Sequence, residues 1–330
     1  MTDHNVNTDV TDANIYGALK DKEPQKEPRS QWKDVWDQFR KHKGAMIGGG
    51  FLLGITLFVL IGPLLWQVDP KQLDIRNKDL RPIYTLLWDG DAKTLWSRPF
   101  GTDNLGRDIM ATLIAGGRAS LAVGWAAMTL SLLLGTLVGV SAGYFKRLDG
   151  VLMRLTDLFL SLPILPLLLV AVTLFRQPLR AAFGPEGGMF ILIVGVIAIT
   201  SWMPTARIVR GEILALKERE FVLAARSIGT TPFQIILRPL LPNVISPIMV
   251  SATLGLATAI ITESALSFHG VGFPSDFPTW GKLLSDAVPR MEEFPERVML
   301  PGLLISLVVL SVNYLGDGLR DALDPRIRGR

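Results

Sequence analysis

The sequence predicts an all-α integral membrane protein with six transmembrane helices. Hydrophobic residues make up 49% of the 330 residues, and the mean hydropathy is +0.34, which is high for a soluble globular protein. The hydrophobic residues gather in six uncharged stretches of about 20 residues, the length that an α-helix needs to cross a bilayer. Lys and Arg are frequent in alternate short connections between these stretches, which identifies one side of the bundle as cytosolic.

The segment before the first stretch is expected to stay in the cytosol. Residues 1–30 are polar and contain no hydrophobic segment with a cleavage site, so they predict a disordered cytosolic tail and no cleaved signal peptide. Residues 31–43 (QWKDVWDQFRKHK) can form a helix with Trp32, Trp36 and Phe39 on one face. This pattern predicts an interfacial amphipathic helix on the inner leaflet, and a juxtamembrane helix packed on the bundle fits it equally well.

The six uncharged stretches define the predicted spans. An even number of spans places both termini on one side, and the positive charges make that side the cytosol. Residues 69–118 are then a periplasmic loop leading into the second span, and residues 119–330 form the core domain with a short cytosolic C-terminus. The third span is expected to begin before its uncharged stretch, near Val151. The predicted spans are residues 44–68, 119–145, 158–175, 187–206, 240–262 and 298–316.

Glycines recur at helical spacing in the first two spans. Gly135, Gly139 and Gly143 are four residues apart in the second span, as are Gly50 and Gly54 in the first. Small residues at this spacing let helix backbones approach closely in a membrane. We expect these glycines to mark packing within the bundle or across a subunit interface, although glycine is also common in membrane helices without such a role.

The connection between the fourth and fifth spans predicts a short cytosolic helix. Residues 212–228 have helical character, Gly229 suits a helix end, and Pro232 suits the turn that follows. We place the helix at about residues 218–231, before the chain returns to the membrane. Such an element on the inner face predicts that another protein drives this one. A connector packed only against its own bundle is the alternative.

This connection resembles the "EAA…G…LP" loop of bacterial ABC importer permeases. Ala224, Ala225, Gly229, Leu241 and Pro242 stand at the spacing of that motif, whereas Leu223 replaces its first Glu, so no role of that carboxylate carries over. In the family, this loop forms the coupling helix that docks in a groove of the ATPase subunit. The resemblance implies that the ATPase-coupling residues here are Glu220, Phe221, Ala224, Ala225, Arg226, Gly229, Pro232, Leu241 and Pro242.

More of the chain is similar to one branch of that family, the "C" permeases for dipeptides and oligopeptides. The similarity runs from about residue 35 to the C-terminus, and five separated segments match in the right order. His269 departs from the apolar residue more usual in the branch, and it is given no role. The matching segments are Phe100–Gly124, Asp149–Pro163, Ser201–Lys217, Ile261–Gly272 and Asn313–Arg326.

The resemblance implies a type I ABC importer permease fold in the bacterial inner membrane. It further implies a second homologous permease, two ATPase subunits that bind ATP and Mg, and a periplasmic substrate-binding protein that delivers a peptide. Relatives in this branch also carry nickel, glutathione and other small solutes, so the solute stays open. The ATPases would act on this chain through the helix at residues 218–231.

Several charged residues lie where a transport pathway or an outer gate would be. Asp103, Arg107 and Asp108 occur in a turn-rich segment before the second span, and a hydrogen-bonded loop fits them equally well. Glu263 is expected at the outer end of the fifth span, where bonding to backbone groups is favoured over contact with a peptide ammonium. Asp157 is expected to pair with Arg154, three residues earlier on the same helix. Trp280 is expected to seat the outer loop at the membrane interface.

The sequence also argues against other classes of function. Cys is absent, the three His residues are scattered, and no phosphate-binding loop or catalytic motif occurs, so no enzyme site, metal or cofactor is expected on this chain. No basic stripe with interleaved aromatic residues indicates nucleic-acid binding. An ion-coupled secondary transporter would need an ionisable relay deep in the spans, and none is evident. An intramembrane enzyme would need a nucleophile and base at one depth, and no convincing pair occurs.

Overall fold

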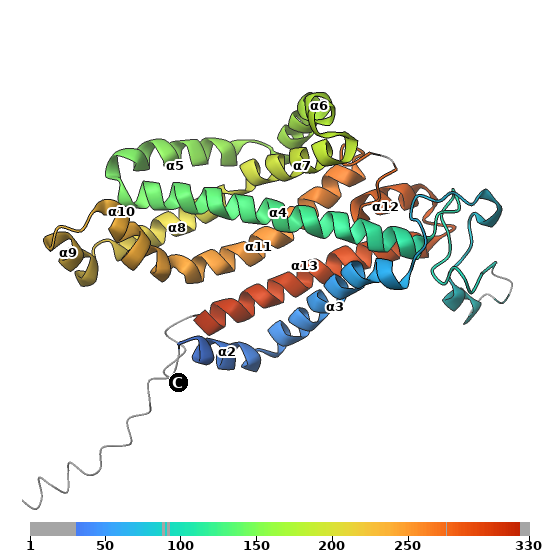
Figure 1. Cartoon of the computed structure of the whole chain (residues 1–330), viewed down its shortest axis with the longest axis horizontal. Helices are drawn as coiled ribbons and strands as arrows, with labels where there is room; N and C mark the ends of the chain where they lie inside the picture. The colour runs from blue at the N-terminus through green and yellow to red at the C-terminus, as the bar shows by residue number, and fades with distance from the viewer. Residues whose placement is uncertain (1–30, 88–89, 91–92, 275, 324–330) are drawn as a thin grey trace, which may run out of the picture.

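The computed structural model describes residues 31–87, 90, 93–274 and 276–323, and the regular elements of this part of the chain are helical. The predicted tail at residues 1–30 lies outside the described residues. Figure 1 shows an elongated bundle whose long helices run side by side. Five helices are long and apolar enough to cross a membrane by themselves, and a bent pair forms a sixth span. The structure therefore agrees with the predicted bundle of six spans.

The first span is α3 (Lys43–Leu65), and it packs along α13 (Pro295–Leu323). The short helix α2 (Gln31–Lys41) precedes it and lies against α13, where the Phe39 ring sits beside Gly318. Trp36 stacks on Phe39 with ring centroids 5.9 Å apart, and it remains 54% exposed. Helix α2 is therefore packed on the bundle through Phe39, while Trp36 stays exposed on its surface.

The second span, α4 (Ile109–Tyr144), is the central helix of the bundle. It begins at Ile109, ten residues before the predicted start at residue 119, because the charged Arg118 lies within the helix and Asp108 caps its N-terminus. The backbone is so close to α8 (Met203–Leu216) that a Cβ on Gly135 would lie 2.6 Å from the carbonyl oxygen of Trp202, which directly precedes α8.

Gly139 and Gly143 make equally close approaches to α8, which confirms the predicted packing within the bundle for this series. Gly50 and Gly54 behave differently, because a Cβ on either would meet no atom of the described chain within 4 Å. Gly50 and Gly54 therefore serve no helix contact in the described part of the chain, whereas a Cβ on Gly48 of the same helix would lie 2.9 Å from the Ser311 carbonyl oxygen of α13.

The prediction for the third span, residues 158–175, was wrong in its bounds. Two helices, α5 (Lys146–Ser161) and α6 (Ile164–Phe183), meet at Leu162 and Pro163, and only α6 is long and apolar enough to cross the membrane. Proline breaks a helix but is well suited to the first positions of the next one, so Pro163 ends one helix and starts the other.

The fourth span is a bent pair of helices. α7 (Pro185–Ser201) and α8 (Met203–Leu216) meet at Trp202 with a bend of 42°. Pro204 lies in the first turn of α8, where it cannot supply a backbone donor to the preceding helix. The bend lets α8 continue along α4 beyond the predicted end of this span at residue 206.

The remaining elements complete the two ends of the bundle. At one end, α9 (Glu220–Ser227) and α10 (Pro232–Ile235) lead through a π-helical segment, η3 (Ile236–Leu240), into the fifth span α11 (Leu241–Phe268). At the other end, η1 (Ile75–Asn77), η2 (Ile83–Leu87), α12 (Trp280–Ala287) and η4 (Val288–Arg290) surround the N-terminus of α4. We call the end with α9 the inner end and the opposite end the outer end.

Candidate functional sites at the two ends of the bundle

The inner end carries α9, which is shorter than the predicted helix at residues 218–231. The chain leaves α8 at Leu216, forms a turn, and starts α9 at Glu220. At its far end, the N–H of Gly229 donates to the Arg226 carbonyl (2.9 Å) and the N–H of Thr230 to the Ala225 carbonyl (3.1 Å). These two bonds and the φ of 80° at Gly229 form a Schellman cap, so Gly229 ends the helix as predicted.

One face of α9 is fixed to the bundle. Val222 is fully buried and packs in a hydrophobic cluster with Ile235 and Leu240. Ala225 lies half-buried against the same cluster, and the guanidinium of Arg226 lies 5.6 Å from the centroid of the Tyr144 ring. These contacts tie α9 to η3 and to the inner end of α4, so a force on α9 is passed directly to the spans.

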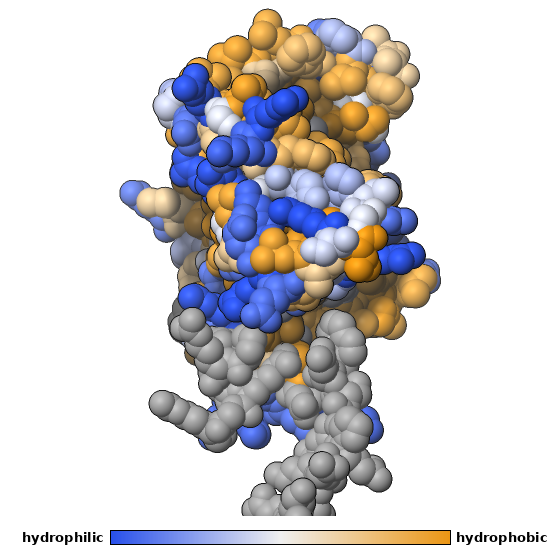
Figure 2. Space-filling model, turned by 90° about the vertical axis from the view of Figure 1, so that its left-hand side faces the viewer, coloured by the Kyte–Doolittle hydropathy of each residue, from blue (hydrophilic) through white to orange (hydrophobic). Residues whose placement is uncertain are grey.

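The other face of α9 and the neighbouring turn expose large hydrophobic side chains. Ile228 is 82% exposed and Phe233 is 70% exposed, and Phe221 and Leu223 are also exposed. Figure 2 looks onto this end and shows hydrophilic residues with separate hydrophobic patches between them. Several large hydrophobic side chains exposed together on an otherwise hydrophilic face are typical of a protein-binding surface. The other predicted coupling residues are exposed here (Glu220, Ala224, Pro232, Pro242) or half-buried (Leu241).

Two charge-assisted contacts brace the helices behind α9. Arg210 of α8 donates to both carboxylate oxygens of Asp149 in α5, at 2.5 and 2.7 Å. The hydrogen bonds from this guanidinium hold the pKa of Asp149 below its usual value. Lys217 donates from Nζ to the Gly143 carbonyl at 3.0 Å, which satisfies the C-terminal end of α4. The inner ends of α4, α5 and α8 are thereby held together.

Asp157 forms an ion pair between helices, which the sequence favoured over contact with a solute, but its partner is not Arg154. Asp157 instead binds Arg207 of α8 at 2.5 Å, and among the described residues no ion pair joins Asp157 to Arg154. The spacing along α5 permitted the local pair, but α8 packs beside α5 and supplies a guanidinium from a neighbouring helix. The side chains of Asp157 and Arg207 are more than half exposed, so this contact adds little stability.

At the outer end, Asp108 fixes the start of α4. Its carboxylate accepts from the Ala111 N–H at 2.7 Å and from Trp66 Nε1 at 3.0 Å, and it lies 3.2 Å from a guanidinium nitrogen of Arg98. Asp108 is only 1% exposed. Of the two readings that the sequence left open for this residue, the structure supports the hydrogen-bonded one, because its carboxylate is enclosed and already bound.

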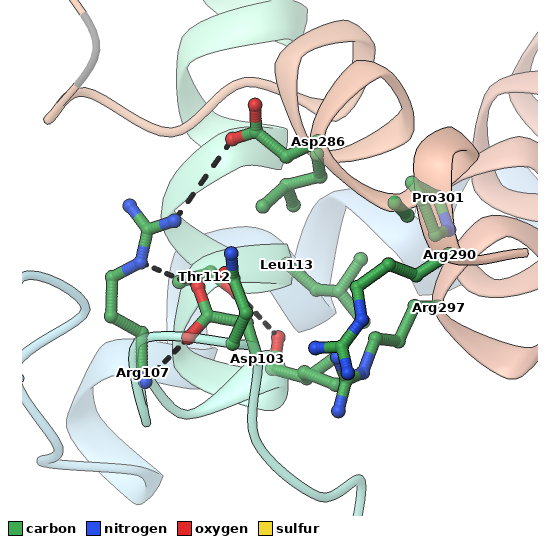
Figure 3. A pocket seen from close by; sticks show the side chains of 12 residues that line it. Asp103, Arg107, Thr112, Leu113, Asp286, Arg290, Arg297 and Pro301 are labelled. Carbon is green, nitrogen blue, oxygen red and sulfur yellow. Dashed lines mark hydrogen bonds and ion pairs between the residues drawn. The ribbon is translucent and has the colours of Figure 1, made fainter. Parts of the chain in front are cut away.

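Asp103 and Arg107 form an ion pair at the edge of a cavity of about 40 Å³ (Figure 3). Arg107 Nε lies 2.6 Å from Asp103 Oδ2, and Arg107 Nη2 lies 3.9 Å from Asp286 of α12. Asp103 also accepts from two backbone N–H groups in its own turn. The pair therefore joins the segment before α4 to α12 and borders a space that opens to the outside.

Asp79 is the centre of a second ionic cluster beside this cavity. It accepts from Arg290 Nη1 at 2.7 Å and from Arg297 Nη1 at 2.9 Å. Burial raises the pKa of Asp79, but the hydrogen bonds from Arg297 and Arg290 outweigh it and hold the pKa below its usual value. Arg297 is buried, and its guanidinium lies 3.8 Å from the centroid of the Phe294 ring. This cluster attaches the loop before α4 to the start of α13.

Glu263 lies at the outer end of α11, as predicted, but it is fully buried. Its Oε1 accepts from Ser267 Oγ at 2.7 Å, so its partner is a side chain rather than the expected backbone group. In this conformation it cannot meet a solute. Trp280, predicted at the membrane interface, is also fully buried, and its Nε1 donates to the Leu113 carbonyl at 3.0 Å. Trp280 therefore locks α12 onto α4.

Several residues that the structure brings together carry no local signal in the sequence. Asp79, Arg290 and Arg297 are far apart in the chain, and no local pattern connects them. Val222 is one apolar residue among many in the sequence, although it is the one fully buried residue of α9. The uncharged run that follows Arg118 predicts that this residue ends a loop, but Arg118 lies on an exposed face of α4. Within the described residues, no group of three or more His, Asp or Glu side chains is arranged to hold a metal.

A bundle of six spans with a short helix between spans four and five at its inner end is the arrangement of an ABC importer permease. Two family profiles match the chain: "binding-protein-dependent transport system inner membrane component" over residues 131–329, and "N-terminal TM domain of oligopeptide transport permease C" over residues 30–82. The chain therefore belongs to the family of binding-protein-dependent transport system inner membrane components, which makes it a multi-pass inner membrane protein.

Curated relatives match nearly the whole chain. The oligopeptide transport system permease protein OppC of Bacillus subtilis is 34% identical over 304 residues, which cover 92% of each chain. The dipeptide transport system permease protein DppC of Alkalihalophilus pseudofirmus is 37% identical over 303 residues, 91% of each chain. The di/tripeptide transport system permease protein DppC of Pseudomonas aeruginosa is 37% identical over 91% of this chain and 93% of its own length. The resemblance to the "C" permease branch is thereby confirmed.

Solved structures support the fold independently. The inward-facing MetNI methionine ABC transporter matches with a TM-score of 0.53 and 19% identity, over 66% of this chain and 98% of the matched chain. A second crystal form of the same transporter matches with a TM-score of 0.50 and 22% identity. At this identity the likeness concerns the fold, which is that of a type I ABC importer permease.

Proposed function

We propose that this chain is one of the two permease subunits of an ATP-driven peptide importer. The single observation that carries the coupling role is α9, which is seated on the bundle through Val222 and presents exposed hydrophobic side chains to the cytosol. The names of the relatives, which are oligopeptide and dipeptide permeases, support a peptide as the solute. This chain would form half of the translocation pathway.

Other subunits would supply the energy for transport. Two ATPase subunits would bind ATP and Mg, and one of them would receive α9 together with its flanking residues. A second, homologous permease would supply the other half of the pathway, and a periplasmic binding protein would deliver the peptide to the outer loops. Both termini would lie in the cytosol, since the start of α2 and the end of α13 lie toward the end that carries α9 (Figure 1). The chain itself would perform no catalysis.

Movement of the ATPases would reach the spans by two routes. One route is the hydrophobic cluster of Val222, Ile235 and Leu240, which joins α9 to η3 and α11. The other is the brace of Arg210 with Asp149, which joins α8 to α5. A short helix seated this way acts as a lever, because it cannot move without moving the helices that it contacts.

Two other functions remain to be distinguished by experiment. The same permease role for another small solute, such as nickel or glutathione, would leave the coupling unchanged. An ion-coupled secondary transporter would not need ATP. Uptake of labelled tripeptide into vesicles is expected to continue with ATP when the proton gradient is collapsed, and to stop without ATP. Uptake that follows the gradient and ignores ATP would overturn the proposal.

Gly229 provides a specific test of the lever. Valine at this position would have to adopt a φ of 80°, which is strained for a β-branched residue by about 1–2 kcal/mol, although the space around its Cβ is open. Gly229→Val is expected to abolish ATP-driven uptake while the protein still inserts. Gly229→Asn is the matched control, because asparagine tolerates this conformation, and its uptake should stay near normal. Equal uptake by both variants would contradict the lever.

A further inference from the structure

An open groove lies between α3, α4 and α7, below the loop that joins α11 to α12. Its volume is about 850 Å³, within the range of small-molecule binding sites. Its walls are mainly apolar and include the aromatic rings of Trp125, Phe190 and Phe277. Two charged side chains also line it, Arg118 from α4 and Glu186 from α7. An aromatic groove with a few charged groups is what a small amphipathic or zwitterionic ligand requires.

Arg118 lies beside the membrane-spanning helix α3, inside its outer end. The neighbouring Gly117 packs so closely on α3 that a Cβ there would lie 2.6 Å from Val59 Cγ2. Val59 is six residues before the outer end of α3 at Leu65, which corresponds to roughly 9 Å along the helix. A charged side chain at this depth is costly unless it faces an aqueous cavity or a partner.

Arg118 also has no counterion in this chain. It is exposed, and among the described residues no hydrogen bond or ion pair reaches its guanidinium. Two arginines of α8 behave differently, since Arg207 and Arg210 each bind an aspartate. Arg118 is therefore free to bind a group from outside the described chain, and an anionic group complements its charge.

One carboxylate, Glu186, lines the same groove, and its partner Lys71 belongs to a neighbouring pocket together with Asp276. Glu186 lies 2.8 Å from the ammonium of Lys71, and Asp276 lies 3.7 Å from it. These side chains are between two fifths and two thirds exposed, so the contacts can exchange with those of a ligand. The groove thus carries one cation, Arg118, and one carboxylate, Glu186, together with aromatic walls.

Building on the proposed function, we propose that this groove holds the imported peptide and that Arg118 binds its C-terminal carboxylate. The planar guanidinium can donate two parallel hydrogen bonds to a carboxylate, a geometry that an ammonium cannot match. The N-terminal ammonium of the peptide replaces Lys71 beside Glu186, and the side chains of the peptide pack on Trp125 and Phe190. A peptide with both termini free complements this arrangement of charges.

Cross-linking in the purified transporter tests this assignment without the binding protein. The full complex of both permeases and both ATPases is placed in nanodiscs, with p-benzoylphenylalanine in place of Trp125 and radiolabelled trialanine as the probe. Unlabelled trialanine should compete at least about tenfold better than trialanine amide, which lacks the terminal carboxylate, because a charge-assisted pair is lost. Arg118→Gln should lower labelling about tenfold and remove that difference, and Arg118→Lys should keep part of it.

Arg180→Gln is the matched control, since Arg180 lies near the outer end of α6 and outside the groove; it should label normally. Equal competition by trialanine and its amide in the unaltered complex, or normal labelling of the Arg118→Gln protein, would overturn the assignment. So would a dependence of labelling on anionic lipid in place of the peptide terminus, since a lipid phosphate would then be the partner. If the unaltered complex, reconstituted in sealed vesicles together with its binding protein, shows no ATP-driven uptake of trialanine, the proposed function itself fails.

Discussion

The outer and inner ends of the bundle differ in what completes them. At the outer end, Asp79 and Asp108 are bound by arginines of the same chain, and Trp280 is buried against α4. At the inner end, α9 buries one side chain fully, Val222, and leaves Ile228 and its neighbours exposed. The outer end pairs its charged groups within the chain, although Leu87 and Trp96 are each 85% exposed there, whereas the inner end exposes hydrophobic side chains on a helix that is seated on the spans.

This difference has an energetic meaning. Burying a large hydrophobic side chain stabilises a complex by about 1.5–3 kcal/mol relative to leaving it in water. The exposed Ile228 and Phe233 therefore offer binding energy that the isolated chain does not use. Changes at the inner end should affect coupling with little effect on stability, and changes at the outer end should do the reverse.

The largest expected effect comes from placing a charge under α9. Ala225 lies half-buried against the cluster of Val222, and a carboxylate there would be desolvated without a partner. Ala225→Asp is expected to detach α9 and to lower ATP-driven uptake by at least about tenfold, the scale of a lost interface hot spot. The amount of protein in the membrane should not change. Uptake and co-purification of the ATPase subunits measure this effect.

Ala225→Ser is the matched control, because serine is small and uncharged, and it should retain most of the uptake. Normal transport by the Ala225→Asp protein would show that α9 does not need its seat on the bundle. A loss of the protein from the membrane would instead mean that the two ends are not as independent as the comparison requires.

The second effect concerns the outer end. Asp79→Asn keeps a residue that tolerates the φ of 59° at this position, but it removes the charge shared by Arg290 and Arg297. Because Arg297 is buried and would lose its counterion, the free energy of unfolding should fall by about 2 kcal/mol. The temperature of unfolding in detergent micelles measures this change, and ATPase binding should not change.

Glu293→Gln is the control for Asp79. Glu293 also binds Arg290, at 3.0 Å, but its side chain is 59% exposed, so its loss should be nearly neutral. If both variants lowered the unfolding temperature equally, burial of the arginine would not be the cause. Loss of ATPase binding by the Asp79→Asn protein would contradict the separation of the two ends.

The contrast also explains how much the sequence could predict. The number of spans, the helix at the inner end and its stop at Gly229 follow from uncharged runs, turn residues and helical spacing, which are local properties of the chain. The predicted bounds of the spans were wrong where a single residue determined the end of a helix. Pro163 divided the third predicted span into α5 and α6, and Arg118 lay inside α4 although a charge normally marks the end of a span.

The candidate sites divide in the same way. The coupling residues lie within one short segment, so a motif could locate them. The outer contacts join residues that are about two hundred positions apart, such as Asp79 with Arg290 and Arg297. Asp157 shows the limit most directly, because helical spacing offered Arg154 as a partner and tertiary packing supplied Arg207. One sequence carries no signal that selects between such partners.

The smallest expected effect tests the brace behind α9 through its pH dependence. Since Arg210 lowers the pKa of Asp149 in the folded protein, the pair stabilises the fold above the unfolded pKa of about 4 and loses this contribution as the pH falls through the folded pKa. Both side chains are about a third exposed or less, so the effect should be about 1 kcal/mol.

Asp149→Asn should therefore lower the unfolding temperature in detergent micelles by a constant amount between pH 7 and about 5, and the difference from the unaltered protein should shrink in more acidic buffer. Asp157→Asn is the control, because the more exposed pair with Arg207 should show a smaller difference at every pH. An equal offset for Asp149→Asn at all pH values would mean that the shape of the side chain matters and not its charge. The inner end would then be braced by packing alone, and the route from α9 to the spans would run only through the cluster of Val222.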